Sequence, residues 1–255
     1  MIIQIYEIQT PAEAATMAEL GVDHIGSVIV SEAEWKIPEI KETLDTVRST
    51  SAKSSLITLF NTVDSVLRTL DYYQPDIIHF CEALTDHPDV RSYCRHLIAL
   101  QQDVKKRFPP VKVIRSIPIA ESGKENSIPT LELSQKFEPY SDFFLTDTML
   151  VDQSRIVDDS QPVQGFVGIT GRTCNWDTAA DLVAASRIPV ILAGGVSPAN
   201  VSDGITRVRP AGVDSCTLTN ATDENGHPIR FRKDPVKVKQ LIDAVREAEG
   251  MSNVD

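Results

Sequence analysis

Residues 189–201 read PVILAGGVSPANV and contain, in order, an apolar run, a pair of glycines and a helix-start signal. The apolar run is typical of a strand that is buried on both faces. Ser197 followed by Pro198 is typical of the residues that begin a helix. A strand that passes through a short loop into a helix is part of a βαβ unit. The stretch therefore predicts a parallel sheet that is covered by helices.

The same strand-and-helix pattern recurs along the chain. We expect strands at 2–8, 24–30, 54–60, 76–80, 112–119, 142–147, 189–195 and 212–218, and helices at 11–20, 38–49, 63–72, 88–107, 128–138, 177–186, 198–207 and 235–248. Eight such units in a chain of 255 residues are typical of a (β/α)8 TIM barrel. No linker interrupts the pattern, so we expect a single TIM-barrel domain over 1–255 with a flexible tail at 249–255.

Charge and composition limit the partners that the protein can bind. The net charge is −11, which argues against binding to nucleic acid or to an anionic membrane surface. The N-terminal residues do not resemble a signal peptide, and no apolar run is long enough to span a membrane. The four cysteines lack the spacing of a zinc site or a redox pair. These features predict a cytoplasmic protein with reduced thiols.

Metal binding is not predicted either. His79 and Cys81 share one face of a predicted strand, but the sequence offers no convincing third ligand. We therefore expect no metal, and we expect His79 to line a pocket at the end of its strand.

The glycine pair Gly194 and Gly195 follows the seventh of eight expected strands and precedes a helix. Backbone amides at such a turn, together with the positive end of a helix, favour the binding of an anion. TIM barrels commonly hold phosphate at this place. A tight turn would explain a glycine pair equally well. We expect the pair to bind the phosphate of a phosphorylated small-molecule substrate.

Several motifs resemble the phosphoribosylanthranilate isomerase family, whose members are TIM-barrel enzymes of tryptophan biosynthesis. The matching pieces, in the order found in that family, are LTDT (145–148), GITGRTCNW (168–176), PVILAGGVSPANV (189–201), GVD (212–214) and KDP (233–235). The resemblance implies an Amadori isomerisation by general acid and base catalysis, with no cofactor. It also implies that the glycine-rich loop 168–176 helps to hold the substrate phosphate, with Thr170, Gly171 and Arg172 nearest to it.

Asp147 matches the residue that acts as the acid in the family. Phe143, Leu145 and Asp147 share a strand face, so the carboxyl group should lie at the top of an apolar stack. Burial at that position would raise the pKa of the carboxyl group, as an acid at neutral pH requires.

The base is harder to assign, because the family has a cysteine in a KxCG-like run and this chain has none there. An alignment without a gap places Tyr6 at the cysteine position, whereas a loop shorter by one residue places Glu7 there. If Ile3 and Ile5 point inward, Glu7 faces Asp147; if Gln4 and Tyr6 point inward, Glu7 points to the helices. We favour Glu7, because a carboxylate is the better base at neutral pH.

Two further positions depart from the family. Where the family has an arginine that binds the anthranilate carboxylate, this chain has Trp35, followed by Lys36. We expect Trp35 to stack on a ring of the substrate or Lys36 to supply the charge. The loop after the last strand is longer and carries the basic cluster 230–233, which is either a binding element or solvated surface.

Three functions follow from these observations. The first is isomerisation of phosphoribosylanthranilate or a similar phosphoribosylated amine. The second is an enzyme of the same barrel lineage with a shifted substrate, and the third is a non-catalytic barrel that binds a phosphorylated ligand. The sequence is compatible with a monomer or a homodimer.

Overall fold

Eight parallel strands close into a barrel in the computed structural model, which describes residues 1–151, 165–168 and 170–252. The strands are β1 (Ile2–Ile5), β2 (His24–Ile29), β3 (Lys53–Thr58), β4 (Ile77–Phe80), β5 (Lys112–Ala120), β6 (Phe143–Met149), β7 (Val190–Leu192) and β8 (Gly212–Ser215). Every neighbouring pair is parallel, and β8 closes the ring by pairing with β1. The predicted TIM barrel is thus confirmed.

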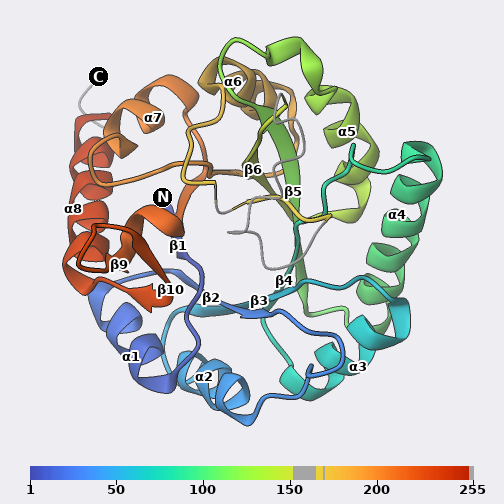
Figure 1. Cartoon of the computed structure of the whole chain (residues 1–255), viewed down its shortest axis with the longest axis horizontal. Coiled ribbons are helices and arrows are strands. Elements are labelled where there is room, and N and C mark those ends of the chain that lie inside the picture. Colours follow the sequence, from blue (N-terminus) through green and yellow to red (C-terminus); the bar gives the residue numbers. More distant parts are fainter. Residues whose placement is uncertain (152–164, 169, 253–255) are drawn as a thin grey trace.

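A ring of helices surrounds the barrel, as Figure 1 shows. The helices are α1 (Pro11–Leu20), α2 (Pro38–Arg48), α3 (Val63–Tyr73), α4 (Val90–Arg107), α5 (Thr130–Phe137), α6 (Trp176–Ala185), α7 (Val201–Val208) and α8 (Pro235–Ser252). Between β8 and α8 the chain forms an antiparallel hairpin of β9 (Asn220–Thr222) and β10 (Pro228–Lys233).

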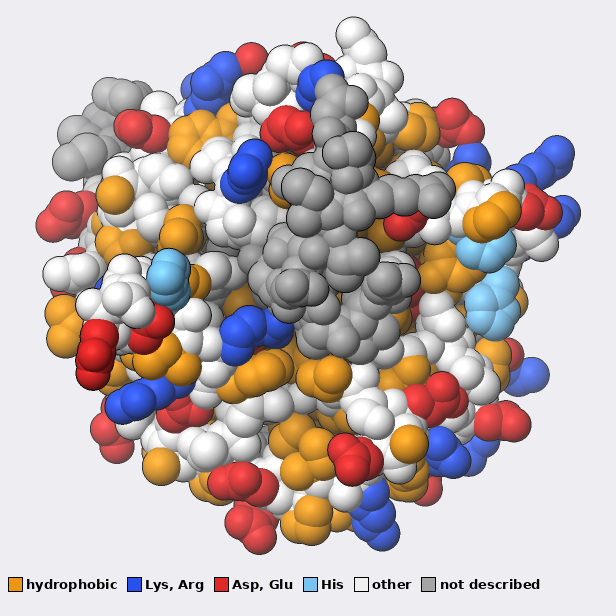
Figure 2. Space-filling model, viewed as in Figure 1, with side chains coloured by type: hydrophobic (Ala, Val, Ile, Leu, Met, Phe, Trp, Pro, Cys, Tyr) orange, Lys and Arg blue, Asp and Glu red, His pale blue; other side chains and the backbone are white. Residues whose placement is uncertain are grey.

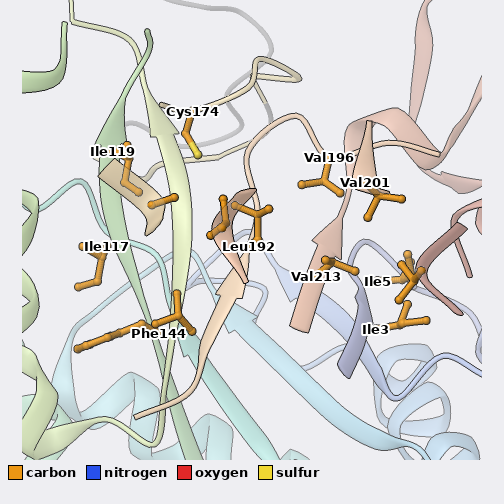
Figure 3. Packing of buried hydrophobic residues seen from close by; sticks show 14 of the residues in the cluster. Ile3, Ile5, Ile117, Ile119, Phe144, Cys174, Leu192, Val196, Val201 and Val213 are labelled. Atoms are coloured by element: carbon orange, nitrogen blue, oxygen red, sulfur yellow. The ribbon is translucent and has the colours of Figure 1, made fainter. Parts of the chain in front are cut away.

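Alternation along the strands divides the apolar side chains into two sets. Ile3, Ile5, Phe144, Leu192 and Val213 belong to the large cluster that also contains helix residues, and Figure 3 shows several members of that cluster. The interior set comes from strands alone or from residues next to them: Ile77, Ile114, Phe143, Leu145, Ile191 and Ala193. A carboxyl group that comes two residues after this interior set on β6 or β8 therefore points into the barrel, near the carboxyl ends of the strands.

The caps explain where several helices begin. Thr10 accepts a hydrogen bond from the Glu13 amide at 3.3 Å, with Pro11 as the first residue of α1. The Asp234 side chain accepts from the Val236 amide at 2.9 Å at the start of α8. In both cases the local sequence predicts the helix start correctly.

The prediction at 197–200 is wrong in detail, because α7 begins at Val201 instead of Pro198. The Asn200 amide group holds the preceding segment as a turn: its oxygen accepts from the Ser197 N–H at 2.8 Å, and its nitrogen donates to the Gly195 carbonyl at 2.9 Å. Side-chain hydrogen bonds of this kind compete with helix formation.

Most of the other predicted boundaries are shifted as well, and the differences at the end of β1, in the last loop and at the C-terminus concern the site or the tail. β1 ends at Ile5 because Glu7 has a φ of +66°, which no strand accommodates. The expected long loop after the last strand, which carries the basic cluster 230–233, is largely the β9–β10 hairpin. α8 continues to Ser252, so the first residues of the expected flexible tail are helical, and 253–255 lie outside the described residues.

Candidate active site

A cavity that opens to solvent lies at the carboxyl ends of the barrel strands. Its described lining consists of Tyr6, Glu7, Val28, Ile57, Leu59, His79, Cys81, Leu145, Asp147, Phe166, Val167, Gly168, Thr170, Gly171, Ala193, Gly194, Gly195, Val196, Asp214, Cys216, Thr217, Leu218 and Arg230. Eight of the ten predicted site residues lie in or beside this lining. On the molecular face in Figure 2, most Lys, Arg, Asp and Glu side chains lie around the periphery.

Asp147 lies on the cavity wall near the end of β6, above Leu145 on the same strand face. The Thr148 amide donates to its Oδ1 at 2.9 Å, and a Cβ placed on Gly168 would lie 3.0 Å from its Oδ2. Burial, reinforced by the negative charge of Asp214, raises the pKa of Asp147 to about 7. A carboxyl group with such a pKa carries a proton that it can donate near neutral pH.

Asp214 lines the same cavity from the last residues of β8. Gln4 on the neighbouring strand donates to its Oδ1 at 3.1 Å, and the Gln4 oxygen in turn contacts the His24 Nδ1 at 3.0 Å. Burial raises the pKa of Asp214 to about 7, although the Gln4 hydrogen bond and the charge of Lys233 act in the opposite direction. Asp214 is the aspartate of the GVD motif, and no role was predicted for it from the sequence. An aspartate inside a buried strand was the available signal.

Tyr6 and Gln4 point into the barrel, so the second of the two orientations considered for β1 is the one found. The Tyr6 ring packs against His79 at a centroid distance of 5.1 Å, and its hydroxyl forms a 2.6 Å hydrogen bond with Ser55. It also occupies the space that a side chain on Gly26 would need. Burial raises the pKa of Tyr6 well above 10.0, so its hydroxyl remains protonated. Tyr6 forms part of the cavity floor.

Glu7 does not point to the helices as that orientation of β1 implies, because its positive φ breaks the alternation of the strand. Its buried carboxylate accepts from the Asn220 side chain at 3.0 Å, the Arg230 Nε at 2.7 Å and the Phe231 amide at 3.3 Å. Burial opposes ionisation, but the charges of Lys233 and Arg230 and these hydrogen bonds outweigh it, and the pKa of Glu7 is lowered from 4.5. Glu7 therefore lies at the cavity as an ion-paired anchor of the hairpin.

The glycine-rich segments meet at the same rim. Gly194, Gly195, Thr170 and Gly171 line the cavity, and both members of the glycine pair have positive φ. A Cβ on Gly195 would lie 2.5 Å from the backbone of residues 172 and 173, so the pair lets the glycine-rich loop approach closely.

Arg172 is not part of the described lining, although its backbone belongs to this contact. Its carbonyl accepts from the Thr148 hydroxyl at 2.7 Å, and its amide donates to the Thr170 hydroxyl at 3.2 Å. Arg172 thus fixes the loop beside the cavity through its main chain.

His79 lines the cavity floor, as expected. Its Nε2 forms a 2.8 Å hydrogen bond with Ser116, and its buried Nδ1 has no hydrogen-bond partner among the residues that the structure describes. Burial, aided by the nearby charge of Arg115, lowers the pKa of His79 to about 3. His79 thus combines a neutral ring, a place in the cavity lining and a buried nitrogen atom without a hydrogen bond to the described residues.

Trp35 and Lys36 are placed differently from the expectation, because neither belongs to the described lining of the cavity. The Trp35 ring packs edge-on against Tyr72 at 5.7 Å, and the Lys36 ammonium group lies 4.7 Å from the same tyrosine ring. The Tyr73 hydroxyl fixes this segment by donating to the Trp35 carbonyl at 2.8 Å. The loop before α2 thus turns outward onto α3.

Among residues 1–151, 165–168 and 170–252, no group of three or more His, Cys, Asp or Glu side chains could hold a metal ion. The helices within the same ranges are all too short or too polar to cross a membrane.

Comparisons with known proteins agree with this geometry. Residues 120–243 match the family model described as N-(5'-phosphoribosyl)anthranilate (PRA) isomerase. The N-(5'-phosphoribosyl)anthranilate isomerase of Methanothrix thermoacetophila is 30% identical over 187 residues, which cover 73% of this chain and 69% of that protein.

Solved structures show the same fold. The phosphoribosyl anthranilate isomerase of Thermotoga maritima superposes with a TM-score of 0.67 at 17% identity, covering 97% of this chain and all of that one. A phosphoribosyl anthranilate isomerase in complex with reduced 1-(o-carboxyphenylamino)-1-deoxyribulose 5-phosphate gives a TM-score of 0.64 at 17% identity, with 97% and 100% covered. From the match to the relative of M. thermoacetophila and from the family model, the chain belongs to the N-(5'-phosphoribosyl)anthranilate isomerase family and is an isomerase of that type.

Proposed function

We propose that the protein converts N-(5'-phosphoribosyl)anthranilate, or a closely similar phosphoribosylated amine, into the corresponding 1-amino-1-deoxyketose phosphate by an Amadori rearrangement. The proposal rests on Asp147, a buried carboxyl group at the cavity wall whose pKa is raised to about 7. Such a group can protonate the ring oxygen of the ribose, after which the ring opens to a Schiff base.

The phosphate is proposed to bind at the rim formed by the two glycine-rich segments. Gly171, Gly194 and Gly195 have positive φ and line the cavity, where backbone N–H groups can face an anion. Thr170 supplies a hydroxyl at the same rim. A related structure holds a phosphorylated ketose analogue, which is consistent with a phosphate subsite in this family.

The remaining contacts in the proposal concern the rest of the substrate. The neutral His79 ring offers its Nδ1 to a ribose hydroxyl at the cavity floor. Arg230 brings positive charge to a cavity wall that also carries three carboxyl groups, those of Glu7, Asp147 and Asp214. We therefore assign the carboxylate end of the substrate to the Arg230 side of the cavity, in place of Trp35 and Lys36.

The test is to incubate the protein with phosphoribosylanthranilate and to follow the loss of substrate fluorescence. The expected result is turnover that the Asp147→Asn variant loses. No turnover at high enzyme concentration would contradict the proposal. Retained binding of inorganic phosphate in that case would favour an enzyme with a shifted substrate or a non-catalytic binding protein.

We further propose that the protein acts in the cytoplasm, as a monomer or a homodimer, on a phosphorylated small molecule. Sedimentation equilibrium of the purified chain distinguishes the two oligomeric states.

A further inference from the structure

The proposed rearrangement needs a group that removes the proton from C2 of the opened sugar, and this inference rests on that proposed function. Neither residue at the end of β1 suits the task. The Tyr6 hydroxyl is buried and bonded to Ser55 at 2.6 Å, and it remains protonated. The Glu7 carboxylate accepts from Arg230, Asn220 and the Phe231 amide. Removing a proton with Glu7 would require breaking an ion pair that holds the hairpin.

Asp214 stands at the same level of the barrel as Asp147. Leu145 pairs in register with Ile191, and Ile191 pairs with Gly212. Asp147 and Asp214 each lie two residues beyond this row, on β6 and β8. Side chains from alternate strands of a TIM barrel form common layers around the axis. The two carboxyl groups thus belong to one layer, and both line the cavity.

The surroundings of the two carboxyl groups differ in a way that separates their roles. Asp214 accepts a hydrogen bond from the neutral Gln4 side chain, and the charge of Lys233 favours its ionised form. Asp147 accepts only the Thr148 amide among the described residues, and the repulsion between the two carboxylates acts equally on both. The Gln4 hydrogen bond and the nearby Lys233 distinguish Asp214 from Asp147 and assign the proton of the pair to Asp147. Paired carboxyl groups whose environments differ in this way divide into an acid and a base.

We propose that Asp214 is the catalytic base that accepts the C2 proton. Asp147 first gives its proton to the ring oxygen while the C1–O bond breaks and the nitrogen lone pair forms the C1=N bond. Asp214 then takes the proton from C2, the C–H electrons form a C1=C2 bond, and the C=N electrons return to nitrogen. In the collapse of this enaminol to the ketone, Asp214 gives its proton to C1 and Asp147 takes the hydroxyl proton from O2. Each carboxyl group thereby regains its starting protonation.

The test compares Asp214→Asn with Glu7→Gln and with a matched surface control, Asp177→Asn, whose side chain is 69% exposed and paired with Arg207. We expect Asp214→Asn to lower kcat at least about 100-fold, as loss of a general base does. It should leave the Kd of reduced 1-(o-carboxyphenylamino)-1-deoxyribulose 5-phosphate within about threefold, because that ligand needs no proton transfer. The kcat of Asp177→Asn should equal that of the wild type. The factor by which kcat falls in Glu7→Gln should be smaller than the factor for Asp214→Asn, by about tenfold or more.

The pH profile separates a catalytic role from a structural one. The ionisable groups that interact electrostatically with Asp214 are Asp147, Lys233, Tyr6 and Cys216. The rise of kcat/KM with increasing pH should disappear in Asp214→Asn and return, with partial activity, in Asp214→Glu. If Asp214→Asn does not fold, the activity and pH profile of Asp214→Glu test the role of Asp214 instead. A kcat/KM profile of Asp214→Glu whose acidic limb coincides with that of the wild type overturns the proposal.

Wild-type turnover is measured first, so that two failures are distinguishable. Absence of wild-type turnover overturns the proposed function and this inference together. Wild-type turnover with kcat of Asp214→Asn within about threefold overturns only the role of Asp214, and a larger loss in Glu7→Gln assigns the base to Glu7 instead.

Discussion

The Arg230 guanidinium donates to the carboxylate of Glu7, a residue 223 positions earlier in the chain, and joins the β9–β10 hairpin to the end of β1. Glu7 is buried, whereas the Arg230 side chain is 30% exposed. Arg230 also lies against the Phe231 ring, with its guanidinium carbon 4.7 Å from the ring centroid. This ion pair fixes one wall of the cavity through residues that are remote in sequence.

Replacing Arg230 by methionine should destabilise the protein by about 1–3 kcal/mol, because Glu7 would be left as a buried carboxylate with a lost donor. The midpoint of urea unfolding measures the change. Arg207→Met, which removes an exposed ion pair with Asp177, is the matched control and should cost at most about 1 kcal/mol. Equal effects of the two substitutions would show that the Glu7–Arg230 pair contributes no more than a surface pair.

Acid should selectively weaken the hairpin anchor. The pKa of Glu7 is lowered from 4.5 in the folded protein, so its ionised form stabilises the fold at any pH above 4.5. As the pH falls below 4.5 toward the lowered folded value, this contribution is lost. The difference in unfolding free energy between the wild type and Glu7→Gln should therefore shrink from pH 6 to pH 3. A difference that stays constant over that range would contradict the assignment.

Asp147→Asn should lower kcat at least about 100-fold if Asp147 is the acid. The same substitution should lower activity but raise the stability of the protein relative to the wild type as the pH increases. Burial, together with the charge of Asp214, raises the pKa of Asp147 from 3.8 to about 7, so the folded state binds a proton that the unfolded state has released. The wild type consequently loses stability as the pH rises from 3.8 toward 7.

Asparagine at position 147 carries no such penalty, so the variant should gain stability relative to the wild type between pH 5 and pH 8. Thermal unfolding at the two pH values measures this gain. Full activity in Asp147→Asn, or a variant that is less stable at pH 8 than at pH 5 relative to the wild type, would contradict the role given to Asp147.

The sequence predicted the barrel because its evidence is local. Strand alternation placed Phe143, Leu145 and Asp147 on one face, and the structure shows Asp147 above the interior cluster that contains the other two. Thr10 and Asp234 marked helix starts correctly because a cap involves only neighbouring residues.

The hairpin was expected as a loop, although Asn225-Gly226 is a recognised hairpin signal. The surrounding polar residues obscured this signal, since β9 and β10 bury little apolar surface of their own. The orientation of Glu7 was beyond local reasoning for a different reason. Its positive φ is stabilised by partners 213 and 223 positions away, Asn220 and Arg230.

Trp35 and Lys36 show the limit of carrying a position over from a family by alignment. Trp35 and Lys36 stand at the aligned position of the family arginine. The Tyr73 hydroxyl, however, holds the segment before α2 against α3. Whether a side chain in this segment points into the cavity depends on that contact between the loop and α3, which the spacing of residues in the loop does not reveal.

Tyr6→Phe should separate the cavity floor from the chemistry. The substitution removes the 2.6 Å hydrogen bond to Ser55 and should cost about 1–3 kcal/mol, because the Ser55 hydroxyl remains buried. Since the Tyr6 hydroxyl stays protonated, we expect kcat to remain within about threefold of the wild type. A loss of about 100-fold in kcat with an intact fold would instead place Tyr6 among the catalytic groups.

Gly195→Ala should weaken the binding of phosphorylated ligands at least about tenfold, because its Cβ would displace the loop at the proposed phosphate site. That atom would lie 2.5 Å from the Arg172 carbonyl carbon and the Thr173 nitrogen, and both are backbone atoms that cannot rotate away. Gly21→Ala is the matched control: Gly21 has a φ of +92° at the end of α1, but no atom lies within 4 Å of its Cβ position. Both variants therefore carry backbone strain of about 1–2 kcal/mol, and only Gly195→Ala moves the loop.

Isothermal titration with inorganic phosphate and with the reduced ketose phosphate analogue should show weaker binding to Gly195→Ala alone. Equal affinity of the two variants would mean that phosphate binds elsewhere on the protein.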